Sequence, residues 1–424
     1  MIHPQQQLAI EFLDEWLASR EQLACLQGYA GTGKTWLVGH WLESVIKAHP
    51  FWTIYVLAPT NKALDVLREK CKHLNQKNLA FFTIDSFLGN RIKRNDDGET
   101  EKHRGKGQEN PDLIVCDEAS MIKKEYDTDL RRKGVRKILY VGDPAQLPPI
   151  NEEISSTFTV AKKFLMTEVV RYDGSIIKIA TMLRQRIESK DMFLLDDLRQ
   201  LKEDSTASFI KMDKMHDWAL NAHSKGLDSR IIAFENITVN QHNKIMHEAL
   251  FPRAPLFGVG ERVLVNETFD LKDDEMLYNG EICTVTKCEL AEPVASVVIY
   301  DVWFTRDSNS DLEINEKKQP KTEYKVQVAL NEMHMLGVHK ELTNQIWELR
   351  KRNENPKALI DLRRPLNNLA PLRHSYACTV HKSQGSTYDI AFCDWGSIYR
   401  CPDRARMMYV AATRPSKFLV VAAR

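Results

Sequence analysis

The sequence predicts an α/β protein with parallel sheets, organised around a glycine-rich loop. Residues 28–35 read GYAGTGKT, which fits the phosphate-binding pattern G-x-x-x-x-G-K-[ST]. A short apolar segment, 23–26, precedes the loop, and an amphipathic segment, 34–49, follows it. Strand and helix patterns then alternate up to about residue 171 and again from residue 231 onward. We therefore expect two parallel-sheet α/β domains.

The glycine loop has the chemistry of a nucleoside triphosphate site. Its glycines let backbone N–H groups face phosphate oxygens, and the N-terminus of the following helix adds positive partial charge. Lys34 is expected to reach the outer phosphates, and the Thr35 hydroxyl to bind Mg²⁺. Gln6 is a candidate reader of the adenine edge. The predicted nucleotide-binding residues are Gln6, Gly28, Ala30, Gly31, Thr32, Gly33, Lys34 and Thr35.

Length and composition favour a globular protein of two or more domains. The 424 residues are 43% hydrophobic and 28% charged with a net charge of +1, so nucleic-acid contacts must come from local patches. No signal-peptide pattern or apolar run of about 20 residues occurs, and we expect a cytoplasmic protein without a membrane partner. The eight cysteines form no C-x-x-C pair, which favours reduced thiols over disulfides or zinc ligands.

Two further strand ends carry residues suited to phosphoryl transfer. Asp117 and Glu118 follow the apolar segment 113–116. Asp117 is expected to bind Mg²⁺, and Glu118 to polarise the attacking water. Gln146 follows the apolar strand 137–141 and is expected to sense the γ-phosphate or to position water.

Two segments interrupt the α/β pattern. Residues 90–110 are basic, contain the turn signal Asp96-Asp97-Gly98 and have few apolar residues, so either a solvated loop or an exposed basic hairpin fits. Residues 257–375 instead predict a small inserted β-barrel followed by a charged helix. Its predicted elements are strands at 262–266, 281–287, 296–304 and 324–329 and a helix near 338–352.

The motifs together resemble those of superfamily 1 helicases over nearly the whole chain. In the order and spacing of that family they are Gln6, GYAGTGKT, APTN at 58–61, DEAS at 117–120, VGDPAQLPP at 141–149, Arg171, TVHKSQGS at 379–386 and YVAATR at 409–414. The HKSQGS stretch favours the 5′-to-3′ subgroup 1B, which contains the Dda-like and RecD-type enzymes.

This resemblance implies two RecA-like domains with ATP between them. The implied ranges are 1–89 plus 110–171 for the first domain, 90–109 for a hairpin insertion, 172–256 plus 376–424 for the second domain and 257–375 for an SH3-like β-barrel insertion. Arg171 and Arg414 match the arginine fingers of the family, whose charge suits transferring phosphoryl oxygens. The predicted catalytic residues are Lys34, Asp117, Glu118, Gln146, Arg171 and Arg414, with Thr35 and Asp117 at the metal.

The resemblance also implies a track for single-stranded DNA. The matching residues are Pro59, Thr60, Asn61, Ser86, Phe87, His381, Lys382 and Ser383. Two positions depart from the family pattern. Asp85 stands where this group often has His, and the 90–110 segment lacks the aromatic tip of a strand-separating pin. We therefore assign no DNA contact to Asp85.

The sequence thus predicts an ATP- and Mg²⁺-dependent DNA helicase that moves 5′ to 3′ and unwinds forked or tailed duplexes in replication, recombination or repair. We expect a functional monomer, with single-strand-binding or replisome proteins as candidate partners. An RNA helicase or a protein-displacing translocase is the alternative, because backbone-tracking motifs do not reveal the sugar. A non-motor P-loop enzyme would not need Arg414, and a subunit that only binds DNA would not need both Lys34 and Glu118.

Overall fold

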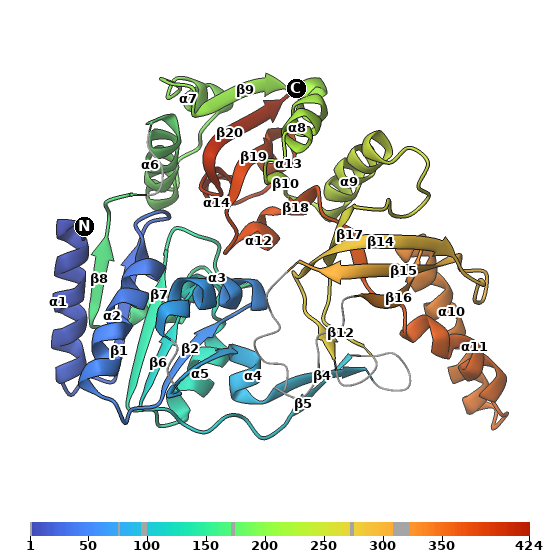
Figure 1. Cartoon of the computed structure of the whole chain (residues 1–424), viewed down its shortest axis with the longest axis horizontal. Coiled ribbons are helices and arrows are strands. Elements are labelled where there is room, and N and C mark those ends of the chain that lie inside the picture. Colours follow the sequence, from blue (N-terminus) through green and yellow to red (C-terminus); the bar gives the residue numbers. More distant parts are fainter. Residues whose placement is uncertain (1, 75–76, 95–99, 171–173, 272–274, 308–322) are drawn as a thin grey trace. The chain divides into compact units, whose positions relative to one another are not determined.

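The computed structural model describes residues 2–424 except 75–76, 95–99, 171–173, 272–274 and 308–322. The chain forms two compact units (Figure 1). Unit 1 comprises Met1–Asn90, Arg104–His242 and Tyr376–Arg424, and unit 2 comprises Arg91–His103 and Asn243–Ser375. Within the described residues, we find no helix with the length and apolar character needed to cross a membrane.

The first half of unit 1 is a six-stranded parallel sheet with the order β3-β2-β6-β7-β1-β8. Its strands are β1 Leu23–Gly28, β2 Ile54–Ala58, β3 Leu79–Thr83, β6 Leu113–Cys116, β7 Lys137–Gly142 and β8 Lys163–Met166. Its helices are α1 Pro4–Ala18, α2 Lys34–Ala48, α3 Asn61–Cys71, α4 Ile84–Leu88 and α5 Lys124–Arg132. Short 3₁₀ turns form at η1 Lys72–Leu74, η2 Ala119–Met121 and η3 Ser156–Thr159.

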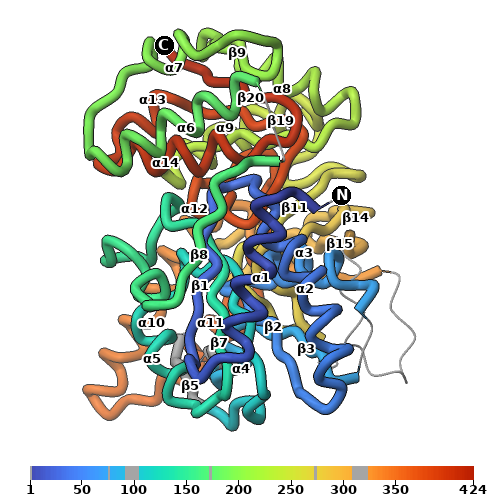
Figure 2. The backbone as a smooth tube through the Cα atoms, turned by 90° about the vertical axis from the view of Figure 1, so that its left-hand side faces the viewer, coloured from blue at the N-terminus to red at the C-terminus, as the bar shows by residue number. Residues whose placement is uncertain are grey.

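Helices cover both faces of this sheet, which explains why the inner strand β6 is apolar along its whole length. In β6, Leu113 and Val115 join a core cluster with α1, α2 and α3, whereas Ile114 and Cys116 join a cluster with α4 and α5. Helix α1 packs beside β8 (Figure 2). Because the strands are parallel, their carboxyl ends lie along one edge, where such sheets bind ligands.

The second half of unit 1 is a five-stranded parallel sheet with the order β18-β10-β19-β20-β9. Its strands are β9 Ala207–Lys211, β10 Ser229–Ala233, β18 Ala377–Thr379, β19 Tyr388–Asp394 and β20 Pro415–Ala423. Its helices are α6 Gly174–Ser189, α7 Leu195–Arg199, α8 Met215–Ser224, α12 Val380–Ser383, α13 Trp395–Tyr399 and α14 Arg404–Ala412, with the 3₁₀ turn η4 Met212–Lys214. The core of this sheet also contains Ala30, Ala145 and Leu147 from the first half, so the two halves pack together.

Unit 2 is built on an antiparallel sheet with the order β16-β15-β14-β11-β17. The strands are β11 Arg262–Val265, β14 Ile282–Leu290, β15 Ile299–Arg306, β16 Tyr324–Ala329 and β17 Leu372–His374, with a small pair β12 Phe269–Asp270 and β13 Met276–Leu277. Alternate residues such as Val302 and Phe304 form its core. Helices α10 Glu332–Lys351 and α11 Lys357–Asn367 pack together through Leu342 and Leu366, and α9 Asn236–Leu250 spans the unit boundary.

The basic segment contains two strands, β4 Asn90–Arg94 and β5 Thr100–Arg104, which form a two-stranded sheet. The predicted turn at Asp96–Gly98 lies outside the described residues. Most of the paired segment groups with unit 2, although the strand before it belongs to unit 1.

Several elements differ from the sequence prediction for identifiable reasons. The strand expected at 296–304 begins only at Ile299, because Ala295 and Ser296 adopt left-handed backbone angles in a turn (φ 47° and 67°). The helix expected at 338–352 begins earlier, at Glu332, where the Asn331 side chain accepts the His334 N–H as a cap.

Candidate nucleotide and nucleic-acid sites

The glycine loop connects β1 to α2, and its backbone carbonyl groups bind the side chain of Lys34. Lys34 Nζ donates to the carbonyl oxygens of Gly28 at 2.7 Å and Tyr29 at 3.0 Å. Gly31 and Gly33 both have φ 83°, a conformation that glycine adopts without strain. Gly33 directly precedes the helix, so the free N–H groups of its first turn face the loop. This is the geometry of a phosphate cradle.

The Gln6 amide lies against this loop. Its Oε1 accepts the His3 N–H at 3.1 Å, and its Nε2 donates to the Thr32 carbonyl at 3.4 Å. A Cβ at Gly33 would come within 2.8 Å of the Gln6 Nε2, and the left-handed backbone there (φ 83°) favours glycine. Gln6 is therefore placed beside the loop, and its role as an adenine reader stays a prediction.

The predicted metal ligands meet at the end of β6. The Thr35 hydroxyl donates to Asp117 Oδ2 at 3.0 Å, and Asp117 Oδ1 accepts the Glu118 N–H at 2.9 Å. A hydroxyl and a buried carboxylate are hard oxygen ligands, which fit Mg²⁺. Burial raises the pKa of Asp117, while the Glu118 N–H, Lys34 and Thr35 oppose that rise.

Glu118 occupies a strained position next to this pair. Its backbone is left-handed (φ 50°, ψ 44°), which is uncommon for a residue with a side chain. Its carboxylate lies close to Gly385, since a Cβ added to that glycine would be 3.7 Å from Glu118 Oε1. Desolvation and the charge of Asp117 raise the pKa of Glu118, whereas the charges of Arg414 and Lys34 lower it. Strain and a shifted carboxyl pKa are both typical of catalytic positions.

A buried hydrogen-bond chain joins the glycine loop to both sheets. The Ala30 N–H donates to the Tyr409 hydroxyl at 3.0 Å, and that hydroxyl donates to Asp143 Oδ2 at 2.7 Å. Arg406 Nη1, from the same helix α14, donates to the carbonyl oxygens of Pro144 at 2.8 Å and Gln146 at 2.9 Å. Asp143 and Tyr409 were not predicted as site residues, although they lie inside the motifs VGDPAQLPP and YVAATR.

Gln146, a predicted catalytic residue, is buried in the loop that Arg406 holds. Its side-chain Oε1 is buried without a hydrogen-bond partner in the structure. A buried amide oxygen normally has a partner, so this atom is suited to receive a ligand or a water.

Arg414 is buried just after α14 and is held by hydrogen bonds to that helix, to its C-cap and to the segment before β19. Its Nε donates to the Val410 carbonyl at 2.9 Å, Nη1 to the Ser386 carbonyl at 3.3 Å and Nη2 to Thr413 Oγ1 at 3.1 Å. Its charge is close enough to lower the pKa of Glu118. The other predicted finger, Arg171, lies outside the described residues.

The structure reveals a further arginine that the sequence analysis missed. The Arg184 guanidinium of α6 stacks 3.7 Å above the ring of Tyr29, a loop residue, and donates to Thr181 Oγ1 at 3.0 Å. Its Nη1 is buried without a hydrogen-bond partner. A signal was available, because Arg184 follows Ile176 and Ala180 at helical spacing on the buried face of α6.

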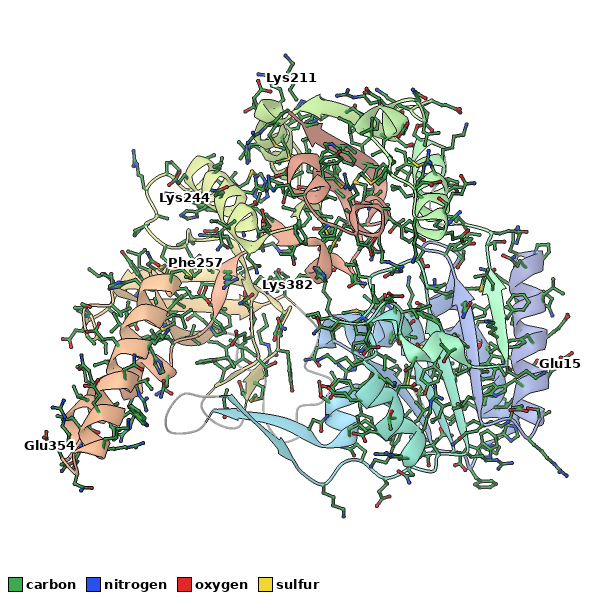
Figure 3. The ribbon with its side chains drawn as sticks, turned by 180° about the vertical axis from the view of Figure 1, so that it is seen from behind. Glu15, Lys211, Lys244, Phe257, Glu354 and Lys382 are labelled. Atoms are coloured by element: carbon green, nitrogen blue, oxygen red, sulfur yellow. The ribbon has the colours of Figure 1, made fainter. Side chains whose placement is uncertain are left out.

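The predicted DNA-track residues follow three strand ends of unit 1. Thr60 caps α3 by accepting the Ala63 N–H at 3.2 Å, with Pro59 and Asn61 half-buried beside it. Ser86 in α4 is exposed. In α12, the side chains of His381 and Lys382 are exposed, and Lys382 is labelled in Figure 3.

Two predicted DNA contacts need correction. The Phe87 side chain is 0% exposed and packs at 6.0 Å from the Tyr55 ring, so it is unavailable to bases in this conformation. Ser383 is also 0% exposed, and its hydroxyl donates to the Val380 carbonyl at 2.7 Å. Phe87 follows the exposed Ser86 in α4, and Ser383 follows the exposed Lys382 in α12. Both helices are short, and the side opposite the exposed residue faces the core. Asp85 has a structural role, since its carboxylate accepts the Tyr126 hydroxyl at 2.7 Å.

A phosphate loop after β1, an acidic pair after β6 of the same sheet and an arginine that follows α14 beside the second parallel sheet define a P-loop ATPase. Comparisons with known proteins narrow this class. One family model, described as an AAA domain, matches residues 2–206, and another, described as a UvrD-like helicase C-terminal domain, matches residues 374–422.

Individual relatives cover nearly the whole chain. The ATP-dependent DNA helicase Dda of Enterobacteria phage T4 is 25% identical over 451 residues, with 96% of each chain covered. An uncharacterized protein of Acanthamoeba polyphaga mimivirus is 22% identical over 494 residues, with 99% of each chain covered. The crystal structure of Pif1 helicase from Bacteroides in complex with ADP-AlF3 and ssDNA shares the fold, with a TM-score of 0.54 at 17% identity over 100% of this chain and 92% of that chain.

These comparisons support an ATP-driven DNA helicase that resembles superfamily 1B. The chain is similar to Dda and shares its fold with Pif1.

Proposed function

We propose that this protein unwinds duplex DNA while moving 5′ to 3′ along a single strand. The observation that carries the proposal is the chain from the Ala30 N–H through the Tyr409 hydroxyl to Asp143. It connects the nucleotide loop of one parallel sheet to a helix of the other, so a change at the nucleotide can alter how the sheets pack. A motor needs such coupling, whereas a kinase or a passive DNA-binding subunit does not.

The ATP chemistry assigns one task to each residue. Lys34 and the loop N–H groups bind the phosphates, and Mg²⁺, which Thr35 and Asp117 would hold, supplies positive charge there. Glu118 accepts a proton from the attacking water, and Gln146 orients that water or the γ-phosphate. Arg414 stabilises the charge that develops on the phosphoryl oxygens, and Arg171 is proposed as the second finger.

The DNA grip is proposed to be independent of base sequence. Thr60, Asn61, Ser86, His381 and Lys382 contact the phosphates and sugars of one strand, and the two RecA-like domains alternate their hold as ATP turns over. For the domains we retain the ranges 1–89 plus 110–171 and 172–256 plus 376–424.

The two insertions and the cellular context complete the proposal. Residues 90–109 act as a pin that separates the strands by steric and electrostatic contact, and 257–375 form an SH3-like barrel. The enzyme works in the cytoplasm as a monomer on forked or tailed DNA in replication, recombination or repair. Single-strand-binding or replisome proteins are its candidate partners.

A strand-displacement experiment tests the function and its direction. Purified protein with ATP and Mg²⁺ is offered duplexes with a 5′ tail, a 3′ tail or blunt ends, together with RNA versions of each. We expect displacement of the 5′-tailed DNA alone. Preferential opening of 3′-tailed DNA would refute the polarity, and preferential opening of RNA would favour the RNA-helicase alternative. Displacement of a protein block without unwinding would favour the translocase alternative.

A further inference from the structure

Three side chains of unit 2 converge on one point that the helicase mechanism does not use. They are His247 on α9, Glu261 just before β11 and His374 at the end of β17, and their ligand atoms all lie within 4.8 Å of one another. Glu261 Oε2 lies 3.0 Å from His247 Nδ1, and Oε1 lies 2.7 Å from His374 Nδ1. The Glu261 side chain is 0% exposed, and the two imidazoles stack with centroids 4.4 Å apart.

The hydrogen bonds of His247 define what its Nδ1 atom can carry. The Nε2 atom lies 3.0 Å from the Ala254 carbonyl oxygen, which can only accept, so Nε2 bears a proton. In a neutral ring Nδ1 would then present a lone pair to the Glu261 carboxylate, which is repulsive. Either a second proton on His247 or a metal ion between Nδ1 and the carboxylate removes this conflict.

The surrounding contacts match those of a metal centre. A histidine ligand usually donates its other ring N–H to a backbone carbonyl, as His247 does to Ala254. The carboxylate is oriented as well, because Glu261 Oε2 accepts the Gly258 N–H at 2.8 Å. Phe257, labelled in Figure 3, packs edge-on against the His374 ring at 5.1 Å and limits its rotation.

We propose that His247, Glu261 and His374 form a binding site for a transition-metal ion, with Zn²⁺ as the preferred metal. Two imidazoles and one carboxylate are a known zinc ligand set, and water would complete the tetrahedron. Bonds of about 2.0–2.2 Å separate tetrahedral ligands by roughly 3.4 Å, so the two contacts of Glu261 with the imidazoles, at 3.0 and 2.7 Å, would lengthen by less than about 1 Å. Imidazole nitrogens favour Zn²⁺ over Mg²⁺, which prefers oxygen ligands.

Another histidine cluster shows why convergence matters. In unit 1, His216 Nε2 contacts His242 Nδ1 at 2.9 Å, and His242 Nε2 contacts Asp394 at 3.1 Å. Both ring nitrogens of His242 are used in opposite directions, so these groups form a line and share no common point. In the part of the chain that the structure describes, the His247 cluster alone offers three converging ligands. The thiol of Cys288 is near enough to feel the charge of Glu261, but its sulfur is not among the converging atoms.

The site has a structural purpose within unit 2. His247 and Glu261 lie near the start of the Asn243–Ser375 part of the unit, whereas His374 belongs to its last strand. A bound ion would therefore fasten the first and last segments of the inserted sheet to each other. It would stabilise unit 2 without touching the ATP chemistry.

Zinc binding to the full chain tests this proposal. After chelator treatment and dialysis, the protein is titrated with Zn²⁺ against a competing indicator dye, and its thermal midpoint is measured with and without the ion. We expect one tightly bound Zn²⁺ per chain and a midpoint several degrees higher with Zn²⁺, because the ion binds the folded state. The variants Glu261→Gln and His374→Gln should lose both effects, whereas the control variant His242→Gln should keep both.

X-ray absorption at the zinc edge provides an independent readout if a variant is too unstable to titrate. The parent chain should show two imidazole ligands and bond lengths of about 2.0–2.1 Å. No Zn²⁺ binding by the parent, or unchanged binding by folded Glu261→Gln protein, overturns the proposal and leaves a protonated His–Glu–His network. A zinc spectrum without imidazole scattering overturns it as well.

Discussion

The Tyr409 hydroxyl offers a direct test of the link between nucleotide loop and second sheet. Tyr409→Phe keeps the fully buried ring and removes one oxygen that serves both Ala30 and Asp143. A bond to a charged carboxylate contributes roughly 1.5–3 kcal/mol, and a neutral one about 0.5–1.5 kcal/mol. We therefore expect the free energy of unfolding to fall by about 2–4 kcal/mol. Urea denaturation measures this change.

A matched control separates loss of stability from loss of coupling. Tyr140→Phe removes another buried hydroxyl that donates to a buried aspartate, Asp127 Oδ1 at 2.6 Å, inside the core of the first sheet. Both variants should be less stable, but at a temperature where both remain folded only Tyr409→Phe should lose DNA-stimulated ATP turnover. Equal turnover in the two variants would refute the coupling argument.

Other predictions follow from the site and from unit 2. Glu118→Gln should still bind ATP but hydrolyse it about 100-fold more slowly, and turnover at the parent rate would exclude Glu118 as the base. Arg414→Ala should reduce turnover while single-strand binding without nucleotide stays near normal; a parallel loss of both in binding and ATPase assays would indicate misfolding. Replacing 93–106 with a Gly-Ser linker should reduce unwinding in strand-displacement assays and spare DNA-stimulated ATP hydrolysis; unchanged unwinding would exclude a pin. In metal-free protein, hydrogen bonding to Glu261 outweighs burial and raises the pKa of His247 above 6.5, and the bonds to His247 and His374 likewise lower the pKa of Glu261 from 4.5 to about 2. The contribution of these bonds to the free energy of unfolding should be largest between about pH 4.5 and 6.5. It should be lost as pH rises through the raised His247 pKa or falls toward 2. Urea denaturation across pH measures the difference in unfolding free energy between parent and Glu261→Gln, and a difference that does not change with pH would contradict this prediction.

The parallel sheets were predictable because their strands are unusual in composition. A segment such as Leu113–Cys116, apolar at every position, fits only a strand that is covered on both faces. The α6 helix was not predicted, although Ile176 and Ala180 recur at helical spacing on its buried face. The stacking of Arg184 on Tyr29 could not be predicted, because only the tertiary structure reveals that contact.

Some of the site residues could be predicted from the sequence, and others could not. Lys34, Thr35 and Asp117 could be predicted because short motifs carry them at fixed spacing. The Tyr409–Asp143 bond joins residues 266 positions apart, and no local pattern indicates such a contact. The resemblance placed Phe87 on the DNA track by its position along the chain, but a sequence match does not tell which way a side chain points, and here it points into the core.

The backbone at Glu118 has a consequence for directed evolution of this enzyme. Its left-handed conformation costs roughly 1–3 kcal/mol for a residue with a side chain, and its carboxyl also stands beside the like charge of Asp117. Glycine would adopt the same angles without strain. A screen that rewards heat resistance alone would therefore enrich Glu118→Gly, and, with Glu118 as the proposed base, the selected variants would be more stable proteins that no longer hydrolyse ATP. Because of this one position, any such screen must also select for ATP hydrolysis.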